Sequence, residues 1–189
     1  MEIRRFEISG LCLLTPRRFE DDRGLFAEVF NARALTEVLG PDAVFVQDNL
    51  SRSRRAGTVR ALHFQKPPNA QGKLVRVSQG AIRDVAVDLR VGSETYGHHL
   101  GVDLVADALE LFWVPPGFAH GFVTLAPDTE VTYKTTAYYS PEDEAGIAWD
   151  DPDLAIDWGV TAENAVLADR DRVQPAFADL GAPFQVLQA

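Results

Sequence analysis

The sequence predicts an all-β fold, an antiparallel sandwich or barrel with a few short helices. Short runs that are apolar, or that alternate between apolar and polar residues, recur along most of the chain. Gly, Pro, Asn and Asp separate these runs, as they do where turns join neighbouring strands. The runs follow one another at intervals of about 8–12 residues, which is typical of antiparallel sheets and not of βαβ units.

Nine segments carry this strand pattern. We expect strands over residues 11–14, 44–47, 59–64, 74–77, 82–89, 100–105, 109–114, 122–125 and 131–139. Residues 31–40 form the clearest helix, since Asn31 can cap its first turn and Gly40 can end its last. No repeat or linker divides the 189 residues, so we expect one domain over residues 1–189, with a looser C-terminal segment from about residue 160.

The formal net charge of −10 argues against nucleic acid and anionic membranes as partners. The charge is unevenly distributed: residues 1–90 hold 15 Lys and Arg against 11 Asp and Glu, whereas residues 91–189 hold 3 against 17. Either this asymmetry is a chance property of a solvated surface, or the first half receives an anionic ligand such as a diphosphate. No apolar run approaches the ~18–20 residues of a membrane span, and the N-terminal residues lack the features of a signal peptide. With Cys12 as the one cysteine, no internal disulfide can form, and we expect a cytoplasmic location.

Three clusters of residues could carry chemistry. In the first, residues 60–65, strand alternation places Arg60, Leu62 and Phe64 on one face and His63 and Gln65 on the other. A histidine at the end of an apolar strand is more often a packed core residue than a base. A functional role for the nearby Lys73 requires an adjacent strand that brings it beside His63.

The second cluster, residues 115–122, delivers His120 from a Pro- and Gly-containing turn and resembles half of the cupin metal signature. In metal cupins the other half supplies a His-x-His pair, but here Gln65 stands where the second histidine should be. The adjacent His98 and His99 would point to opposite faces of a strand. The chain therefore offers too few ligands at the right spacing for zinc or iron, and we expect no metal.

The third cluster holds Tyr133 and Tyr139, which would share one face of a continuous strand over residues 131–139. Strand aromatics mostly serve packing, so either tyrosine alone is weak evidence for a site. Residues 167–172, with alternating acidic and basic side chains, read in isolation as an exposed tail.

Taken in order, eight motifs resemble the dTDP-4-dehydrorhamnose 3,5-epimerase family over about residues 1–175. They are residues 22–24 (DRG), 45–49 (FVQDN), 60–65 (RALHFQ), 71–76 (QGKLVR), 84–90 (DVAVDLR), 113–115 (WVP), 117–122 (GFAHGF) and 138–141 (YYSP). The resemblance implies a cupin-like jelly-roll β-barrel or sandwich, a homodimer, and no metal or other cofactor. It also implies a dTDP-4-keto-6-deoxyhexose substrate, dTDP-4-dehydro-6-deoxy-D-glucose, whose C3 and C5 are inverted to give dTDP-4-dehydro-L-rhamnose.

The resemblance assigns roles residue by residue. His63 is the expected general base, Asp171 its hydrogen-bond partner, Tyr133 the general acid on the opposite face of the sugar, and Lys73 a neighbour of the C4 carbonyl oxygen. Tyr139 is expected as an aromatic wall, and Arg23 and Glu28 are expected to reach the partner subunit's site. The full set expected to contact the nucleotide sugar is Arg23, Glu28, Gln47, Asp48, Asn49, Arg60, Lys73, His120, Tyr139, Glu144 and Arg170.

The chain departs from the family pattern at two places. Ala61 replaces the usual Gly, and Arg170 replaces the usual Lys, with Asp169 competing with Asp171 as the partner of His63. The alternatives are a mono-epimerase acting at C3 or C5 only, a non-catalytic nucleotide-sugar binder, and a metal-dependent cupin enzyme.

Overall fold

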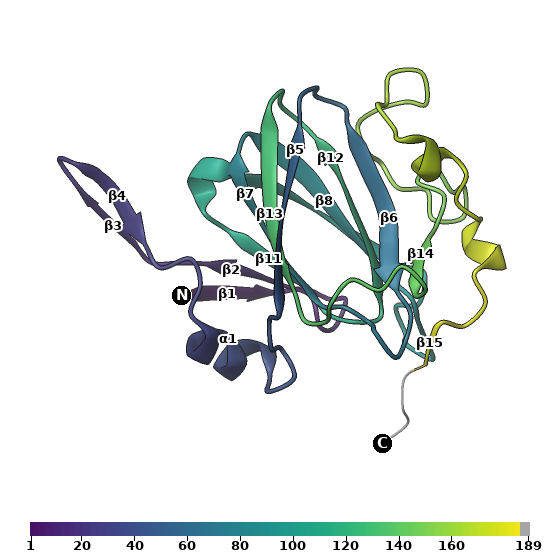
Figure 1. Ribbon diagram of the computed structural model, residues 1–189, viewed down its shortest axis with the longest axis horizontal. Coiled ribbons are helices and arrows are strands. Elements are labelled where there is room, and N and C mark those ends of the chain that lie inside the picture. Colours follow the sequence, from purple (N-terminus) through teal and green to yellow (C-terminus); the bar gives the residue numbers. More distant parts are fainter. Residues whose placement is uncertain (186–189) are drawn as a thin grey trace.

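The computed structural model describes residues 1–185, and it confirms the predicted all-β fold (Figure 1). Two sheets pack face to face as a jelly-roll-like sandwich, and all strand pairings within these two sheets are antiparallel. The six-stranded sheet has the order β1 (Glu2–Arg5), β2 (Cys12–Thr15), β11 (Leu111–Val114), β7 (Lys73–Gln79), β13 (Thr129–Thr135) and β5 (Gln47–Ser53). The five-stranded sheet has the order β10 (His99–Val105), β8 (Ala81–Asp88), β12 (Phe118–Thr124), β6 (Val59–Gln65) and β14 (Glu144–Gly146).

The main core lies between the two sheets. Val75 and Phe112 of the six-stranded sheet meet Ile82 and Phe122 of the five-stranded sheet in one cluster of buried side chains. Removing this apolar surface from water is the main driving force for the packing of the sheets. Among the described helices, none is long and apolar enough to cross a membrane.

The predicted helix is confirmed as α1 (Ala32–Leu39), which covers the outer face of the six-stranded sheet. The Asn31 side chain accepts a hydrogen bond from the Ala34 backbone N–H at 3.2 Å, and the Gly40 N–H donates to the Thr36 carbonyl at 3.0 Å. Leu35 is the fully buried residue of the helix and packs in a cluster with Trp113. The cap and the end of the helix therefore both act as the sequence indicates.

The chain after β14 covers the outer face of the five-stranded sheet, and in Figure 1 it lies beyond β6 and β14. Trp149, Trp158 and Phe184 anchor it in a second buried cluster with residues of β6, β8 and β12, and the Trp158 indole N–H donates to the Trp149 carbonyl at 2.6 Å. Its regular elements are short: the 3₁₀ helices η2 (Asp169–Arg172) and η3 (Phe177–Asp179), and β15 (Phe184–Gln185), which pairs in parallel with β9 (Arg90–Val91). A third 3₁₀ helix, η1 (Ala106–Ala108), precedes β11.

Two strand predictions need correction, and one hairpin was missed. The strand expected at 44–47 begins only at Gln47, because the apolar residues before it lie outside the strand, where Phe45 packs edge to face against Trp113. The strand itself is largely polar and lacks the apolar signal. The strand expected at 131–139 ends at Thr135, so Tyr139 lies on the following loop and does not share a continuous strand with Tyr133. The hairpin of β3 (Arg18–Asp21) and β4 (Gly24–Ala27) carried no recognised pattern; all its residues but one are exposed, and in Figure 1 it stands away from both sheets.

The predicted alternation along β6 is correct for Leu62 and Phe64, which lie on the face opposite His63, but it is wrong for Arg60, because a bulge interrupts the strand. His63 pairs with His120 of β12, but Arg60 pairs with Phe122, so Ala61 and Leu62 together lie opposite Gly121. Both Ala61 and Leu62 pack in the outer cluster, whereas Arg60 and His63 turn to the inner face. An extra residue in one strand thus puts Arg60 and His63 on the same wall.

Gly121 is required where it faces this bulge. A Cβ added there would lie 2.4 Å from the Ala61 Cβ and 2.8 Å from the Arg60 carbonyl oxygen. We therefore expect Gly121→Ala to lower the free energy of unfolding by about 3 kcal/mol in denaturant titration, because overpacking shifts backbone as well as side chains. Gly101→Ala in β10 is the matched control, since its nearest contacts lie at 3.9–4.0 Å and its stability should stay within about 0.5 kcal/mol of wild type. Equal stability of Gly121→Ala and the control would refute this account of the bulge.

Candidate active site

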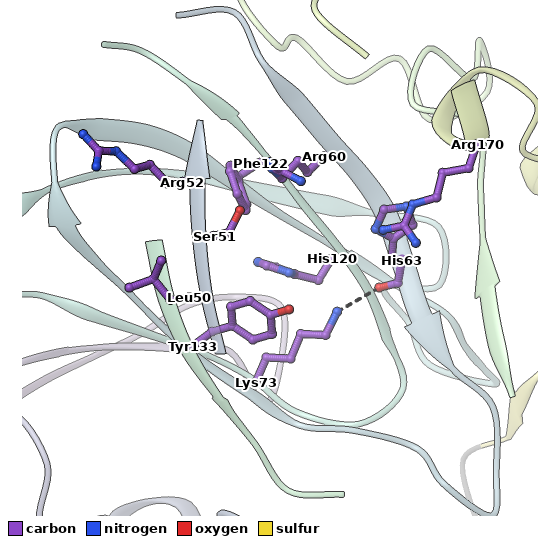
Figure 2. Close-up of a pocket in the computed structure, with 10 residues that line it drawn as sticks. All are labelled: Leu50, Ser51, Arg52, Arg60, His63, Lys73, His120, Phe122, Tyr133 and Arg170. Carbon is purple, nitrogen blue, oxygen red and sulfur yellow. Dashed lines mark hydrogen bonds between the residues drawn. The ribbon is translucent and has the colours of Figure 1, made fainter. Parts of the chain in front are cut away.

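A cavity of about 360 Å³ opens between the two sheets, and polar side chains dominate its walls (Figure 2). The five-stranded sheet contributes Arg60, His63, His120 and Phe122, and the C-terminal segment contributes Arg170. The six-stranded sheet contributes Leu50, Ser51, Arg52, Lys73 and Tyr133. A smaller cavity of about 240 Å³ shares His63, Lys73, Tyr133 and Arg170 with the first and adds Tyr139 and Glu144.

His63 is held by a carboxylate. Its Nε2 lies 2.7 Å from Asp171 Oδ1, and Asp171 is only 3% exposed. A carboxylate at Nε2 requires the proton on that nitrogen, which leaves Nδ1 as the basic position of the neutral ring. The 3₁₀ helix η2 supplies Asp171, so the predicted partner is the one that contacts His63, whereas Asp169 makes no hydrogen bond to it among the described residues.

Lys73 and Tyr133 face His63 from the other sheet. The Lys73 ammonium donates to the His63 carbonyl oxygen at 3.2 Å, as drawn in Figure 2. Burial lowers the pKa of Lys73 to about 8, against the opposing effects of Asp84 and Glu144. Burial raises the pKa of Tyr133, so this phenol keeps its proton at neutral pH even though Arg60 and Arg170 act in the other direction. One wall of the cavity therefore offers a base, and the other offers a proton donor and a cation.

A second polar cluster lies where the two cavities meet. The Tyr139 hydroxyl donates to Glu144 Oε2 at 2.6 Å, and this bond raises the pKa of Tyr139. Arg170 lies between two carboxylates, with Nη1 3.5 Å from Glu144 Oε1 and Nε 3.7 Å from Asp171 Oδ1. The Tyr139 backbone N–H donates to Gln47 Oε1 at 3.0 Å, so the loop after β13 is tied to β5.

Some of the predicted residues do not line the cavity within one chain. Gln47 donates to Asn49 Oδ1 at 2.8 Å on the half-buried face of β5, but Asp48 points to the exposed face and pairs with Lys134 Nζ at 2.6 Å. Arg23 lies in the β3–β4 turn and pairs with Asp21. Glu28 follows that hairpin and accepts a hydrogen bond from Asn31.

The sequence reasoning missed Asp84, which is fully buried on β8. Its Oδ1 lies 2.7 Å from His120 Nε2, so His120 also has a carboxylate partner. The sequence signal that could have identified Asp84 is an acidic residue inside a strand whose other residues are mostly apolar. Leu50, Ser51, Arg52 and Phe122 were missed as well; Ser51 follows Gln47 and Asn49 with the period of two that defines one strand face.

Within residues 1–185, no three His, Cys, Asp or Glu side chains gather in an arrangement that could hold a metal ion. Gln65, at the position where metal cupins have a histidine, uses its amide in loop contacts: Nε2 donates to the carbonyls of Asn69 and Tyr138, and Oε1 accepts from the Ser140 N–H.

The chain is similar to known proteins over nearly its whole length. The family model described as dTDP-4-dehydrorhamnose 3,5-epimerase matches residues 5–179. A Pseudomonas aeruginosa protein of that name is 49% identical over 95% of this chain and 97% of its own, and a Sinorhizobium fredii protein of that name is 46% identical over 100% and 95%. The crystal structure of the Legionella pneumophila dTDP-6-deoxy-D-glucose-3,5-epimerase in complex with dTDP-4-keto-L-rhamnose superposes with a TM-score of 0.92 at 42% identity, covering 100% of this chain and 99% of that one. The resemblance seen in the sequence is thereby confirmed, and this chain belongs to the dTDP-4-dehydrorhamnose 3,5-epimerase family.

Proposed function

We propose that this protein inverts C3 and C5 of dTDP-4-dehydro-6-deoxy-D-glucose to form dTDP-4-dehydro-L-rhamnose, a step of dTDP-L-rhamnose biosynthesis. The observation that carries the proposal is the placement of His63 and Tyr133 on facing sheets of one cavity, with the buried Lys73 beside them. Epimerisation removes a proton from one face of a carbon and returns one to the other face, so it needs two such groups.

The C4 ketone makes both reactions possible. The C3–H and C5–H bonds are α to this carbonyl, so removal of either proton moves the C–H electron pair into an enolate. His63 takes the proton at Nδ1, and Asp171 stabilises the imidazolium through Nε2. The Lys73 ammonium stabilises the negative charge that develops on the C4 oxygen. Tyr133 then donates its phenolic proton to the opposite face of the carbon, and the step is complete when solvent restores both groups.

Basic side chains suit the diphosphate of the substrate. Arg60 and Arg170 both line the cavity, and a guanidinium fork can donate two hydrogen bonds to phosphate oxygens. Arg60 is oriented by a hydrogen bond from its Nε to Ser53 Oγ at 3.3 Å. Tyr139 is half exposed and hydrogen-bonded to Glu144. We propose that its ring flanks the nucleotide base or the sugar of the substrate as an aromatic wall. The acidic net charge of the chain therefore does not oppose an anionic substrate, because the local field at the cavity is set by these cations.

We also propose that two copies of the chain associate. The β3–β4 hairpin exposes Phe19 by 50% and Phe26 by 69%, which is unfavourable for a segment that contacts nothing. A homodimer in which the hairpin crosses to the partner would bury these rings and carry Arg23 and Glu28 towards the partner's cavity. The single, buried Cys12 still favours a reducing compartment, and a cytoplasmic location remains a prediction.

The proposed reaction is tested by incubating the purified protein with dTDP-4-dehydro-6-deoxy-D-glucose in D₂O after chelation of metals. We expect deuterium at both C3 and C5, because each enolate is reprotonated from exchangeable groups. NMR and mass spectrometry locate the label. Label at one carbon alone would make the protein a mono-epimerase, and no label with the substrate bound would make it a binder.

The roles of the two facing groups separate in variants. His63→Ala should lower the rate of deuterium incorporation by about 10²–10⁴-fold, because the base is removed. Tyr133→Phe should slow net epimerisation more than label exchange, since His63 can still remove and return a proton on its own face. Label exchange and net epimerisation are followed in one NMR time course. Equal losses of both rates in Tyr133→Phe would contradict the assignment of acid and base to opposite faces.

The dimer is tested by light scattering during size-exclusion chromatography. Wild type should have twice the mass of one chain, and Phe26→Glu should shift it to the mass of a single chain, because a charge is placed in the buried contact. Leu125→Glu is the matched control: Leu125 is also an exposed apolar residue, but it lies in the turn after β12. A wild-type protein of single-chain mass would rule out the dimer.

A further inference from the structure

A buried carboxylate next to the cavity takes no part in the proton transfers described above. Asp84 lies on β8 with no exposed surface; its Oδ1 is 2.7 Å from His120 Nε2, and its Oδ2 has no hydrogen-bond partner among the described residues. We infer that Asp84 is a positioning residue for the proposed epimerisation: it fixes the ring of His120 and supplies the buried negative charge that keeps the Lys73 ammonium charged. This inference rests on the proposed function.

The contact with His120 determines which hydrogen bonds that ring can make. The carboxylate at Nε2 requires the proton on Nε2, so in the neutral ring Nδ1 can only accept a hydrogen bond. Burial lowers the pKa of His120, and the neighbouring Lys73 and His63 act in the same direction, against Asp84. His120 is therefore neutral at neutral pH. Because it lines the cavity and its Nδ1 can only accept a hydrogen bond, it favours a ligand hydroxyl over a carbonyl at that position.

A neutral His120 leaves the charge of Asp84 without a counter-ion on β12. A buried carboxylate is costly unless a cation compensates it. Lys73 is the nearby candidate, because it lines the same cavity as His120, the partner of Asp84. Burial lowers the pKa of Lys73, and Asp84 is the largest influence that raises it, ahead of Glu144. The direct salt-bridge partner of Asp84 is His120, so we infer that its attraction for Lys73 acts through the low-dielectric interior.

The other charged and titratable groups that face Lys73 come from every neighbouring element. They are Glu144 of β14, His63 and Arg60 of β6, His120 of β12, Tyr133 of β13 and Arg170 of η2. Two carboxylates, Asp84 and Glu144, raise the pKa of Lys73, and Glu144 is already engaged by Tyr139 and Arg170. Asp84, in contrast, has a single side-chain hydrogen-bond partner among the described residues, His120.

The two histidines thus form a matched pair with different tasks. His63 and His120 are direct partners across β6 and β12, and each holds a carboxylate through Nε2 at 2.7 Å. Asp171 lies beside Arg170 on the C-terminal segment and serves the group that gains and loses a proton. Asp84 lies in the interior of the sheet and serves groups whose charge stays constant through the reaction.

The test is Asp84→Asn, which keeps the shape and a hydrogen-bond acceptor for His120 but removes the charge. In wild type, kcat/KM should fall as the pH rises through about 8, where Lys73 loses its proton. Without the charge of Asp84, the alkaline fall should move to lower pH by about one unit, which makes kcat/KM about fivefold lower at pH 8. Asp103→Asn, which removes an exposed carboxylate from the adjacent strand β10, should leave the profile unchanged. An unshifted alkaline limb in Asp84→Asn would overturn the inference.

A second measurement uses the wild-type protein, so it remains possible if Asp84→Asn does not fold. It also distinguishes this inference from the proposed function. ¹⁵N NMR of the wild-type imidazoles at pH 7 should show His120 neutral and protonated on Nε2, and the Lys73 side chain should titrate near pH 8. A proton on Nδ1, or a charged His120, would overturn the inference. Absence of deuterium incorporation by wild type, with these NMR signals as expected, would instead refute the epimerase activity.

Discussion

The bulge in β6 is the constraint on which the site depends. In an unbroken strand, Arg60 and His63 would point to opposite faces, so one of them would lie outside the sandwich. Because Ala61 and Leu62 together occupy the space opposite Gly121, Arg60 and His63 share one wall of the cavity. The small residue on β12 makes room for the methyl group of Ala61, which is fully buried. The strand distortion therefore shapes the wall of the cavity and is not a defect in the sheet.

Around this wall, each sheet contributes a different kind of group. The five-stranded sheet carries the two histidines and their carboxylate partners, while Lys73 and Tyr133 come from the six-stranded sheet. A planar enolate held between the sheets would have the base on one face and the phenol on the other. Burial raises the pKa of Tyr133, which keeps the phenol protonated, but it lowers the pKa of Lys73. The same low-dielectric interior therefore favours the protonated phenol and disfavours the charged ammonium.

The fold class, the helix and most inner strands could be predicted from the sequence, because their apolar periodicity and turn residues are local signals. Tyr139 and the start of β5 were misplaced, because apolar or aromatic residues continue past the strand ends: Val44, Phe45 and Val46 precede β5, and Tyr139 lies on the loop after β13. The assignments of His63 and Asp171 came from resemblance, and the 2.7 Å contact between residues 108 positions apart has no local signature. Asp84 could have been suspected as a lone acid in a buried strand, but its partner His120 lies on another strand. The bulge could not be predicted, because it shows only in the register between β6 and β12, two strands far apart in the sequence.

The late position of Asp171 in the chain has a consequence for synthesis. Both sheets are complete in sequence once β14 has left the ribosome, but the carboxylate that orients His63 arrives 25 residues after Gly146. That carboxylate reaches its place only as the segment anchored by Trp149 and Trp158 packs over the outer face of the five-stranded sheet. A nascent chain can therefore assemble its sandwich before Asp171 has been synthesised, and the contact between His63 and Asp171 forms only afterwards.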